Sequence, residues 1–168
     1  RVTKRPAVVI ATSGPGATNL ITGLADAMLD STPLVCITGQ VVSSLIGSDA
    51  FQETDVVSIS MPVTKWNYQI RRAEEIPEIM AKAFYIAGTG RPGPVLLDIT
   101  KDAQFGELDY EYHKITQIRS YTPIPKLDIE AVRQAADLIN NAKKPFVLVG
   151  QGVLLSNAQK EFRKFVEK

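Results

Sequence analysis

Two short runs of apolar and β-branched residues constrain the fold of this chain more than any other feature. They are "PLVCITG" at residues 33–39 and "PVLLDIT" at residues 94–100. Strands of a parallel sheet have this composition because helices cover both faces of the sheet and leave little of each strand in water. The sequence therefore predicts the α/β class, with a parallel sheet flanked by helices.

Helical patterns alternate with the predicted strands. Further strands are predicted at residues 7–12 and 63–70. Two helices are indicated by apolar residues that recur at three- and four-residue steps, as in amphipathic helices. The first set is Ala17, Leu20, Ile21, Leu24 and Met28, and the second is Ile76, Ile79, Met80, Ala83, Phe84 and Ala87. Such alternation is typical of parallel strands joined by helical crossovers.

The glycine-rich stretch "ATSGPGATN" joins the first predicted strand to the first predicted helix. Turns of this kind bind phosphate when their backbone N–H groups are free. Here Pro15 has no N–H to offer, and Asn19 stands where a dinucleotide fingerprint needs a small residue. A nucleoside-triphosphate loop would also need Lys followed by Ser or Thr. The residues alone therefore disfavour a phosphate cradle and leave the role of the turn open.

The pattern changes after Asp102. Residues 103–127 contain scattered aromatic residues and prolines without a sustained period, which indicates a linker. A new unit is predicted at 128–168: a helix capped by Asp128, a strand within "KPFVLVGQGVLL", and a last helix with a capping box of Ser156 and Gln159. One strand and two helices cannot close a core. We therefore expect the beginning of an incomplete domain in a chain that, starting at Arg1, is a piece of a longer protein.

Composition excludes several classes of function. With 19 basic and 18 acidic residues there is no strong net field to attract nucleic acid, and no apolar run is long enough to span a membrane. The single cysteine, Cys36, has no disulfide partner, so we expect a buried thiol in a reducing compartment. A cytoplasmic location is expected for a bacterial protein, and a plastid-targeted precursor is the alternative. His113 lies in the linker and is expected at the surface. No His and Cys set suggests a metal site.

Several longer motifs carry a resemblance to a known family. "TSGPGATN", "GLADAMLDSTPLVCITGQV", "GSDAFQE", "VTKWNY", "GRPGPVLLDITKD" and "KPFVLVGQG" together span nearly the whole chain. They closely resemble the large catalytic subunit of acetohydroxyacid synthase, also called acetolactate synthase. "SGPGATN" is shared by many thiamine-diphosphate enzymes, whereas "GSDAFQE", "GRPGP" and the lysine of "DITKD" are much more specific.

The resemblance implies a function and a domain organisation. Residues 1–102 would form the C-terminal part of a pyrimidine-binding domain, residues 103–127 a linker, and residues 128–168 the beginning of a central FAD-type domain. The intact enzyme would use thiamine diphosphate, Mg²⁺ and FAD to decarboxylate pyruvate and condense the two-carbon unit with pyruvate or 2-oxobutyrate, in branched-chain amino acid biosynthesis. It would be a homo-oligomer, with a dimer interface along the pyrimidine domain and a possible small regulatory subunit.

The resemblance also assigns roles to individual residues. Phe51 and Gln52 would line the active-site pocket, and Lys101 would lie in the access channel, where its charge attracts 2-oxoacid carboxylates. Pro15 and Asn19 would lie near the aminopyrimidine end of the cofactor. FAD would contact Ser31, Arg91 and the backbone of Gly150, Gln151 and Gly152. The diphosphate and its Mg²⁺ would be bound by another domain of a partner subunit, so no metal ligand is assigned to this chain.

The family's catalytic glutamate would lie before Arg1, so we expect this chain alone to be inactive. Three positions depart from the usual family pattern: Val42, Thr100 and Gln151. Two alternatives stay open. One is another thiamine-diphosphate enzyme, of the glyoxylate carboligase or pyruvate oxidase type, and the other is a non-catalytic assembly module. An incomplete domain, unlike such a module, would expose apolar surface where missing elements dock.

Overall fold

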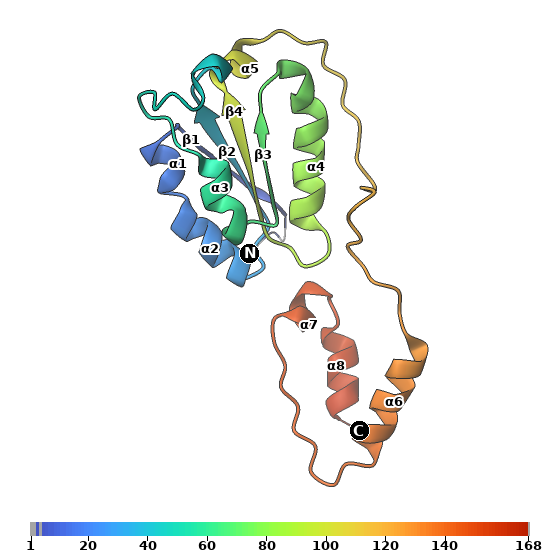
Figure 1. The fold of residues 1–168 in the computed structure, drawn as a ribbon. Coiled ribbons are helices and arrows are strands. Elements are labelled where there is room, and N and C mark those ends of the chain that lie inside the picture. The colour runs from blue at the N-terminus through green and yellow to red at the C-terminus, as the bar shows by residue number, and fades with distance from the viewer. Residues whose placement is uncertain (1–2, 4, 168) are drawn as a thin grey trace. The chain divides into compact units, whose positions relative to one another are not determined.

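A computed structural model describes residue 3 and residues 5–167, which form two compact units, Arg1–Pro125 and Lys126–Lys168. The first unit contains a sheet of four parallel strands (Figure 1). The strands are β1 (Ala7–Ala11), β2 (Leu34–Gln40), β3 (Trp66–Ile70) and β4 (Pro94–Thr100), in the spatial order β1-β2-β4-β3. The predicted parallel sheet is confirmed.

The two runs that predicted buried strands, β2 and β4, pair with each other near the middle of the sheet. Leu34 pairs with Pro94 and Gln40 with Thr100, so the strands are in register over seven residues. Every residue of β4 is buried. This is the position in which a strand is covered on both faces, which explains the nearly continuous apolar run.

Helices cover the two faces of the sheet separately (Figure 1). On one face lie α1 (Pro15–Thr18), α2 (Ile21–Leu29) and α3 (Val56–Ser60); on the other lies α4 (Ile76–Gly88). The single helix predicted over Ala17 to Met28 is thus two helices with a break at Asn19 and Leu20. The predicted strand 63–70 begins only at Trp66, because Pro62 lies in a 3₁₀ turn, η2 (Met61–Val63). The other 3₁₀ turns are η1 (Ser43–Leu45) and η3 (Ala73–Glu75).

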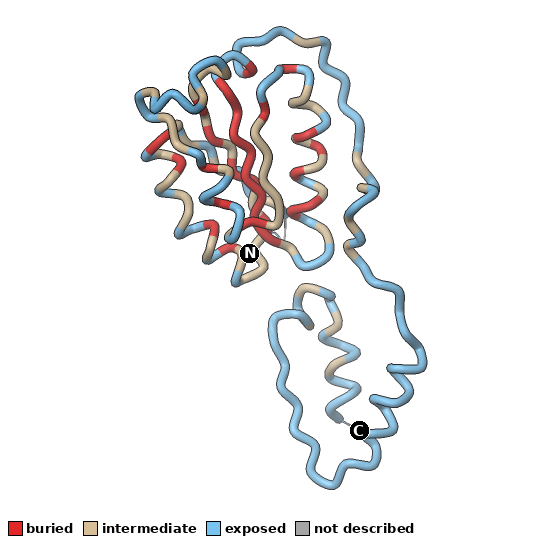
Figure 2. The backbone as a smooth tube through the Cα atoms, viewed as in Figure 1, coloured by how far each residue is buried: buried red, intermediate tan, exposed pale blue. Residues whose placement is uncertain are grey.

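Each face of the sheet has its own apolar core. Buried residues accordingly lie along the strands and along the helices on both sides of the sheet (Figure 2). Between the sheet and α4 lie Val35, Ile70, Ile79, Ala83, Ile86, Ala87, Val95, Leu97, Ile99 and Ala103. Beneath α1, α2 and α3 lie Ala17, Leu24, Cys36, Val56 and Leu96. Alternate residues of β4 enter the two cores, as the two-residue period of a strand requires.

β1 forms one edge of the sheet and is the least covered strand. Val9 packs into the core beneath α2, whereas Val8 and Ile10 point to the other face and keep 47% and 74% of their surfaces exposed. Neither is among the side chains that pack against the α4 core. The first unit therefore has an open apolar area over β1.

The predicted linker is fastened to the first unit. Its first residues belong to a helical turn, α5 (Lys101–Phe105), and Tyr121 later contacts the residues around the end of α4. The Tyr121 hydroxyl donates to Thr89 O over 2.8 Å and accepts from Lys65 Nζ over 3.0 Å. Lys65 also donates to Thr89 O over 2.8 Å and to Ile86 O, so it caps the C-terminus of α4. The compact unit consequently ends at Pro125.

The second unit consists of helices joined by extended chain, α6 (Ile129–Asn140), α7 (Gly152–Leu155) and α8 (Gln159–Val166). The predicted cap of α6 is confirmed, since Asp128 Oδ1 accepts from the Ala131 amide over 3.0 Å. The strand predicted within "KPFVLVGQGVLL" is wrong. No described strand pairs with it, and Phe146 and Leu148 are almost fully exposed. Apolar, β-branched sequence forms a strand only where a neighbour accepts its backbone hydrogen bonds.

The capping box predicted at Ser156 is also wrong. Its hydroxyl donates to Gly152 O over 2.8 Å, back into α7, and the N-cap residue of α8 is Ala158, which makes no side-chain cap hydrogen bond. A serine that follows a short helix can bond to the preceding turn, which removes it as a cap for the next helix.

Candidate functional site

Three segments that carry predicted site residues meet at one edge of the sheet. They follow the carboxyl ends of β1, β2 and β4: the glycine turn at 12–16, the loop at 41–55, and the start of α5 at Lys101. Parallel strands end at the same edge, which is where α/β proteins bind ligands. We refer to residues 41–55 as the 41–55 loop.

The glycine turn is closed against the 41–55 loop at Gly14. Gly14 has φ of +59°, and a Cβ placed on it would lie 2.9 Å from both Cβ and O of Gln52. Only glycine allows this backbone conformation and this close approach. Within the turn the Gly16 amide donates to Ser13 O over 3.3 Å, and just after it the Thr18 amide donates to Gly14 O over 2.9 Å. The turn is therefore a packed wall, in agreement with the weak case for a phosphate cradle.

The 41–55 loop presents Phe51 and Gln52 on an internally bonded frame. The Glu53 carboxylate accepts from the amides of Gly47 and Ala50, the latter over 3.0 Å. These backbone hydrogen bonds, first that of Gly47, hold the pKa of Glu53 below its ordinary value. Phe51 is 87% exposed, so its ring belongs to neither apolar core of the first unit. An aromatic ring so exposed on an ordered loop is available for contact with another group.

Lys101 begins α5 with an exposed side chain, beside the start of the 41–55 loop. Its amide donates to Val41 O over 3.4 Å. The next residue, Asp102, accepts from the Ser43 amide over 3.1 Å. Hydrogen bonds from the side chains of Thr100 and Ser43 lower the pKa of Asp102 to about 2. Sequence reasoning missed Asp102, although an acidic residue in the first turn of a helix is a signal for such bonds.

Sequence reasoning also missed a buried polar cluster under the same edge. The Asp98 carboxylate, fully buried on β4, accepts from Thr38 Oγ1 over 2.7 Å, Gln40 Nε2 over 3.1 Å and Gln69 Nε2 over 3.0 Å. Burial raises the pKa of Asp98, and the three hydrogen bonds oppose that rise. The only available signal was a charged residue within the run "PVLLDIT".

The residues predicted to contact FAD in the first unit lie at the opposite, amino edge of the sheet. Arg91 Nε donates to Ser31 Oγ over 2.9 Å, and Nη2 donates to Met28 O over 3.1 Å and Leu29 O over 3.0 Å. Arg91 thereby caps the C-terminus of α2. The structure brings Ser31 and Arg91 together but separates them from Pro15, Asn19, Phe51, Gln52 and Lys101, which lie on the segments of the carboxyl edge.

The remaining predicted FAD contacts lie in the second unit, where α7 begins. Gln151 is the N-cap residue of α7, and Leu154 donates to its carbonyl over 2.9 Å. An added Cβ on Gly150 or Gly152 would meet nothing within 4 Å. The backbone at these two glycines is therefore open to approach by another group.

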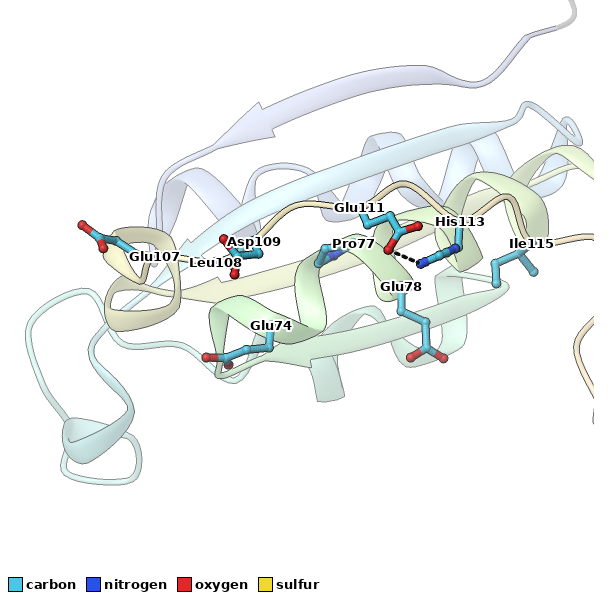
Figure 3. A pocket seen from close by; sticks show the side chains of 9 residues that line it. All are labelled: Glu74, Pro77, Glu78, Glu107, Leu108, Asp109, Glu111, His113 and Ile115. Atoms are coloured by element: carbon cyan, nitrogen blue, oxygen red, sulfur yellow. Dashed lines mark ion pairs between the residues drawn. The ribbon is translucent and has the colours of Figure 1, made fainter.

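Other reactive side chains take no part in these groupings. Cys36 is buried, and desolvation raises the pKa of its thiol to about 11, so it is protonated at neutral pH. His113 is exposed, as expected, and forms an ion pair with Glu111 over 3.5 Å (Figure 3). Both line a cavity of about 1190 Å³ between the linker and the start of α4. Its carboxylates, from Glu74, Glu78, Glu107, Asp109 and Glu111, do not suit an anionic 2-oxoacid.

Comparison with known proteins assigns the chain to a family. The model of the thiamine pyrophosphate enzyme N-terminal TPP binding domain matches residues 1–59, and that of the thiamine pyrophosphate enzyme central domain matches residues 132–168. The first match covers β1, the glycine turn, β2 and the 41–55 loop, which form most of the carboxyl edge. The chain belongs to the thiamine pyrophosphate enzymes.

Within that family, the chain is similar to large subunits of acetolactate synthase. It is 52% identical to the acetolactate synthase large subunit of Corynebacterium glutamicum, over 99% of this chain and 27% of the relative. It is 49% identical to the acetolactate synthase isozyme 1 large subunit of Escherichia coli, over 100% of this chain and 29% of the relative. A probable acetolactate synthase large subunit of Methanococcus aeolicus is also 49% identical, over 99% and 28%. The chain thus spans less than a third of each relative's length.

No described helix is both long and apolar enough to cross a membrane. Among the residues that the structure describes, no group of three or more His, Cys, Asp or Glu side chains could hold a metal ion.

Proposed function

We propose that the protein to which this chain belongs decarboxylates pyruvate with thiamine diphosphate and condenses the two-carbon unit with pyruvate or 2-oxobutyrate. One observation carries the proposal. The glycine turn, the Phe51–Gln52 tip and Lys101 meet at the carboxyl edge, in a chain about half identical to acetolactate synthase large subunits. The activity is proposed for the whole protein; the 168-residue chain by itself is proposed to be inactive.

The glycine turn suits the uncharged end of thiamine diphosphate. The Gly16 amide donates to Ser13 O within the turn and Pro15 has no N–H, so neither offers a donor to an anion, while Gly14 packs closely against Gln52. We assign Pro15 and Asn19 to the aminopyrimidine ring. When bound, thiamine diphosphate supplies the electron sink that decarboxylation of a 2-oxoacid requires. The residues of this chain then bind, orient and exclude water.

Phe51, Gln52 and Lys101 suit the substrate. The exposed ring of Phe51 can cover an apolar methyl group and exclude water, and the Gln52 amide can donate to a 2-oxoacid oxygen. Lys101 supplies a positive charge that raises the local concentration of 2-oxoacid carboxylates. These roles match an edge on which the cation and the two uncharged side chains lie on neighbouring segments.

FAD is proposed to bind Ser31 and Arg91 in the first unit and the backbone of Gly150, Gln151 and Gly152 in the second. The ordered Arg91 guanidinium offers hydrogen-bond donors, and the two glycines leave their backbone uncovered. This assignment accompanies the proposed division into a pyrimidine-binding segment (1–102), a linker (103–127) and the beginning of a central domain (128–168). The match of a central-domain model to residues 132–168 supports it.

Mg²⁺ and the diphosphate are proposed to bind another domain of a partner subunit, as the resemblance implies, and no ligand for either is assigned to this chain. The relatives are called large subunits, which supports a small regulatory partner, and we propose a homo-oligomer for the large chain. The unpaired Cys36 supports a cytoplasmic location.

The proposal is tested by acetolactate formation from pyruvate, with and without 2-oxobutyrate. The full-length protein is supplied with thiamine diphosphate, Mg²⁺ and FAD, and the 168-residue chain is assayed beside it. We expect product from the full-length protein alone. A folded, cofactor-loaded protein that consumes glyoxylate, or that oxidises pyruvate with phosphate, and makes no acetolactate would instead support the other enzyme types.

A further inference from the structure

We propose that Gln40, oriented by the buried Asp98 carboxylate, is a positioning residue that holds both ends of the 41–55 loop and thereby places Phe51 and Gln52. The consequence for catalysis rests on the proposed function, whereas the ordering of the loop does not. Neither residue is among the site residues that the sequence assigns.

A single amide joins the two ends of the loop. Gln40 is the last residue of β2 and is 6% exposed. Its Nε2 donates to Thr54 O over 2.8 Å, and its Oε1 accepts from the Val41 amide over 2.9 Å. Val41 is the first residue of the loop and Thr54 is next to the last. The loop is therefore closed at its base by one side chain of the sheet.

Asp98 decides which way this amide points. The second Nε2 bond of Gln40 runs to Asp98 Oδ2 over 3.1 Å, and a carboxylate accepts hydrogen bonds but donates none when ionised. Reversing the Gln40 amide would place Oε1 against that carboxylate and against the Thr54 carbonyl. Asp98 is itself held by Thr38 and Gln69, each paired with it across a neighbouring strand. Three strands thus fix the direction of the amide.

Glu53 links Thr54, at the base of the loop, to the tip of the loop. Glu53 is the neighbour of Thr54 in the chain, and the Glu53 carboxylate accepts from the amides of Gly47 and Ala50, so these residues move together with the base of the loop. Gln52 lies between Ala50 and Glu53, against the wall at Gly14. A displacement at Thr54 would consequently shift Gln52 relative to the glycine turn. Shifts of about 1 Å in a positioned group can lower rates about a hundredfold.

The test compares three variants of the full-length protein. Gln40→Met keeps the volume of the side chain and removes all three hydrogen bonds. Asp98→Asn keeps the shape of its side chain and removes the charge that orients the amide, so it provides a milder second variant. Val95→Ala is the control. Val95 is buried on β4, as Asp98 is, but its side chain lies in the core between the sheet and α4, on the face opposite to that of Asp98. Hydrogen exchange and steady-state kinetics with pyruvate are measured on each.

We expect Gln40→Met to speed amide exchange within residues 41–55 at least about tenfold, while exchange within 76–88 is unchanged. Asp98→Asn should act in the same direction with a smaller effect. For both variants kcat should fall and KM for pyruvate should rise, with Gln40→Met more strongly affected. Val95→Ala should speed exchange on the α4 face and leave the 41–55 loop and both kinetic constants near those of the parent.

Two results would overturn the proposal. One is unchanged exchange of the 41–55 loop in Gln40→Met. The other is a loss of kcat and loop protection in Val95→Ala equal to that in Gln40→Met, which would reduce Gln40 to a contributor to general stability. If the unsubstituted protein forms no acetolactate, the proposed function fails, and exchange alone then decides whether Gln40 orders the loop.

Discussion

Gly14→Ala offers the most direct test of the packed wall. The substitution forces a Cβ onto a residue with φ of +59° and ψ of −120°, a conformation that costs an L-residue about 1–3 kcal/mol. The same Cβ would lie 2.9 Å from Cβ and O of Gln52, and overpacking of this kind costs a further ~1–3 kcal/mol. The sum, about 2–6 kcal/mol, is a large part of the stability of an ordinary domain.

Two other glycines separate the backbone cost from the contact cost. Gly47 has φ of +86° but nothing within 4 Å of an added Cβ, so Gly47→Ala has only the backbone cost. Gly23 lies within α2 with open space around it, so Gly23→Ala should be neutral or stabilise by up to about 1 kcal/mol. We expect the order of destabilisation Gly14→Ala, then Gly47→Ala, then Gly23→Ala.

The measurement is hydrogen exchange of the β2 and β4 amides in the full-length protein, which reports the free energy of opening of the sheet. Acetolactate formation is followed in parallel, and Gly14→Ala should reduce it most because the displaced residue is Gln52. The reasoning is refuted if Gly14→Ala is no more destabilising than Gly47→Ala, since the close approach to Gln52 would then cost nothing.

Three further predictions follow from the same structure. Phe51→Ala should lower the free energy of urea unfolding by at most about 0.5 kcal/mol, because the ring is 87% exposed, but should lower kcat/KM for pyruvate about tenfold. A loss of unfolding free energy as large as the loss of transition-state binding would contradict the assignment of Phe51 to the substrate. The pKa of Asp102 is lowered from 3.8 to about 2, so its contribution to loop stability is complete above about pH 4 and is lost as pH falls toward 2; exchange of Ser43 should show this dependence, and Asp102→Asn should abolish it. At pH 8 Cys36 in the folded protein should react with iodoacetamide at least about a hundredfold more slowly than in urea, because burial raises the pKa of its thiol from 9.0 to about 11; equal rates would show that the core beneath α2 is open.

The sequence predicted well those helices and strands whose apolar pattern follows from the way in which each one is covered. β2 and β4 are apolar throughout because both faces of each strand are covered, and α4 repeats its apolar residues because one side faces the sheet. The strand predicted near Phe146 failed for the opposite reason. Whether an apolar run forms a strand depends on a neighbour, and no described strand pairs with this one.

The candidate site shows the same division. Phe51, Gln52 and Lys101 were indicated by a resemblance of motifs, and the structure shows only why they can be neighbours. The cluster around Asp98 was not predicted, because Thr38 and Gln69 become its partners through the register of three parallel strands. The pairing of residues on neighbouring strands cannot be read from the sequence around one residue. The Asp in the apolar run "PVLLDIT" therefore did not reveal which side chains bond to it.

The exposed β1 strand has a consequence for handling the 168-residue chain in isolation. Its outer backbone N–H and C=O groups pair with no other described strand, and Val8 and Ile10 extend an apolar surface beside them. An unprotected edge of this kind is a template for pairing with another copy and for aggregation. Pairing between copies at β1 is therefore expected to limit the solubility of the isolated chain. Ile10→Lys is the smallest change that would improve it, because a charged residue on an edge strand opposes such pairing.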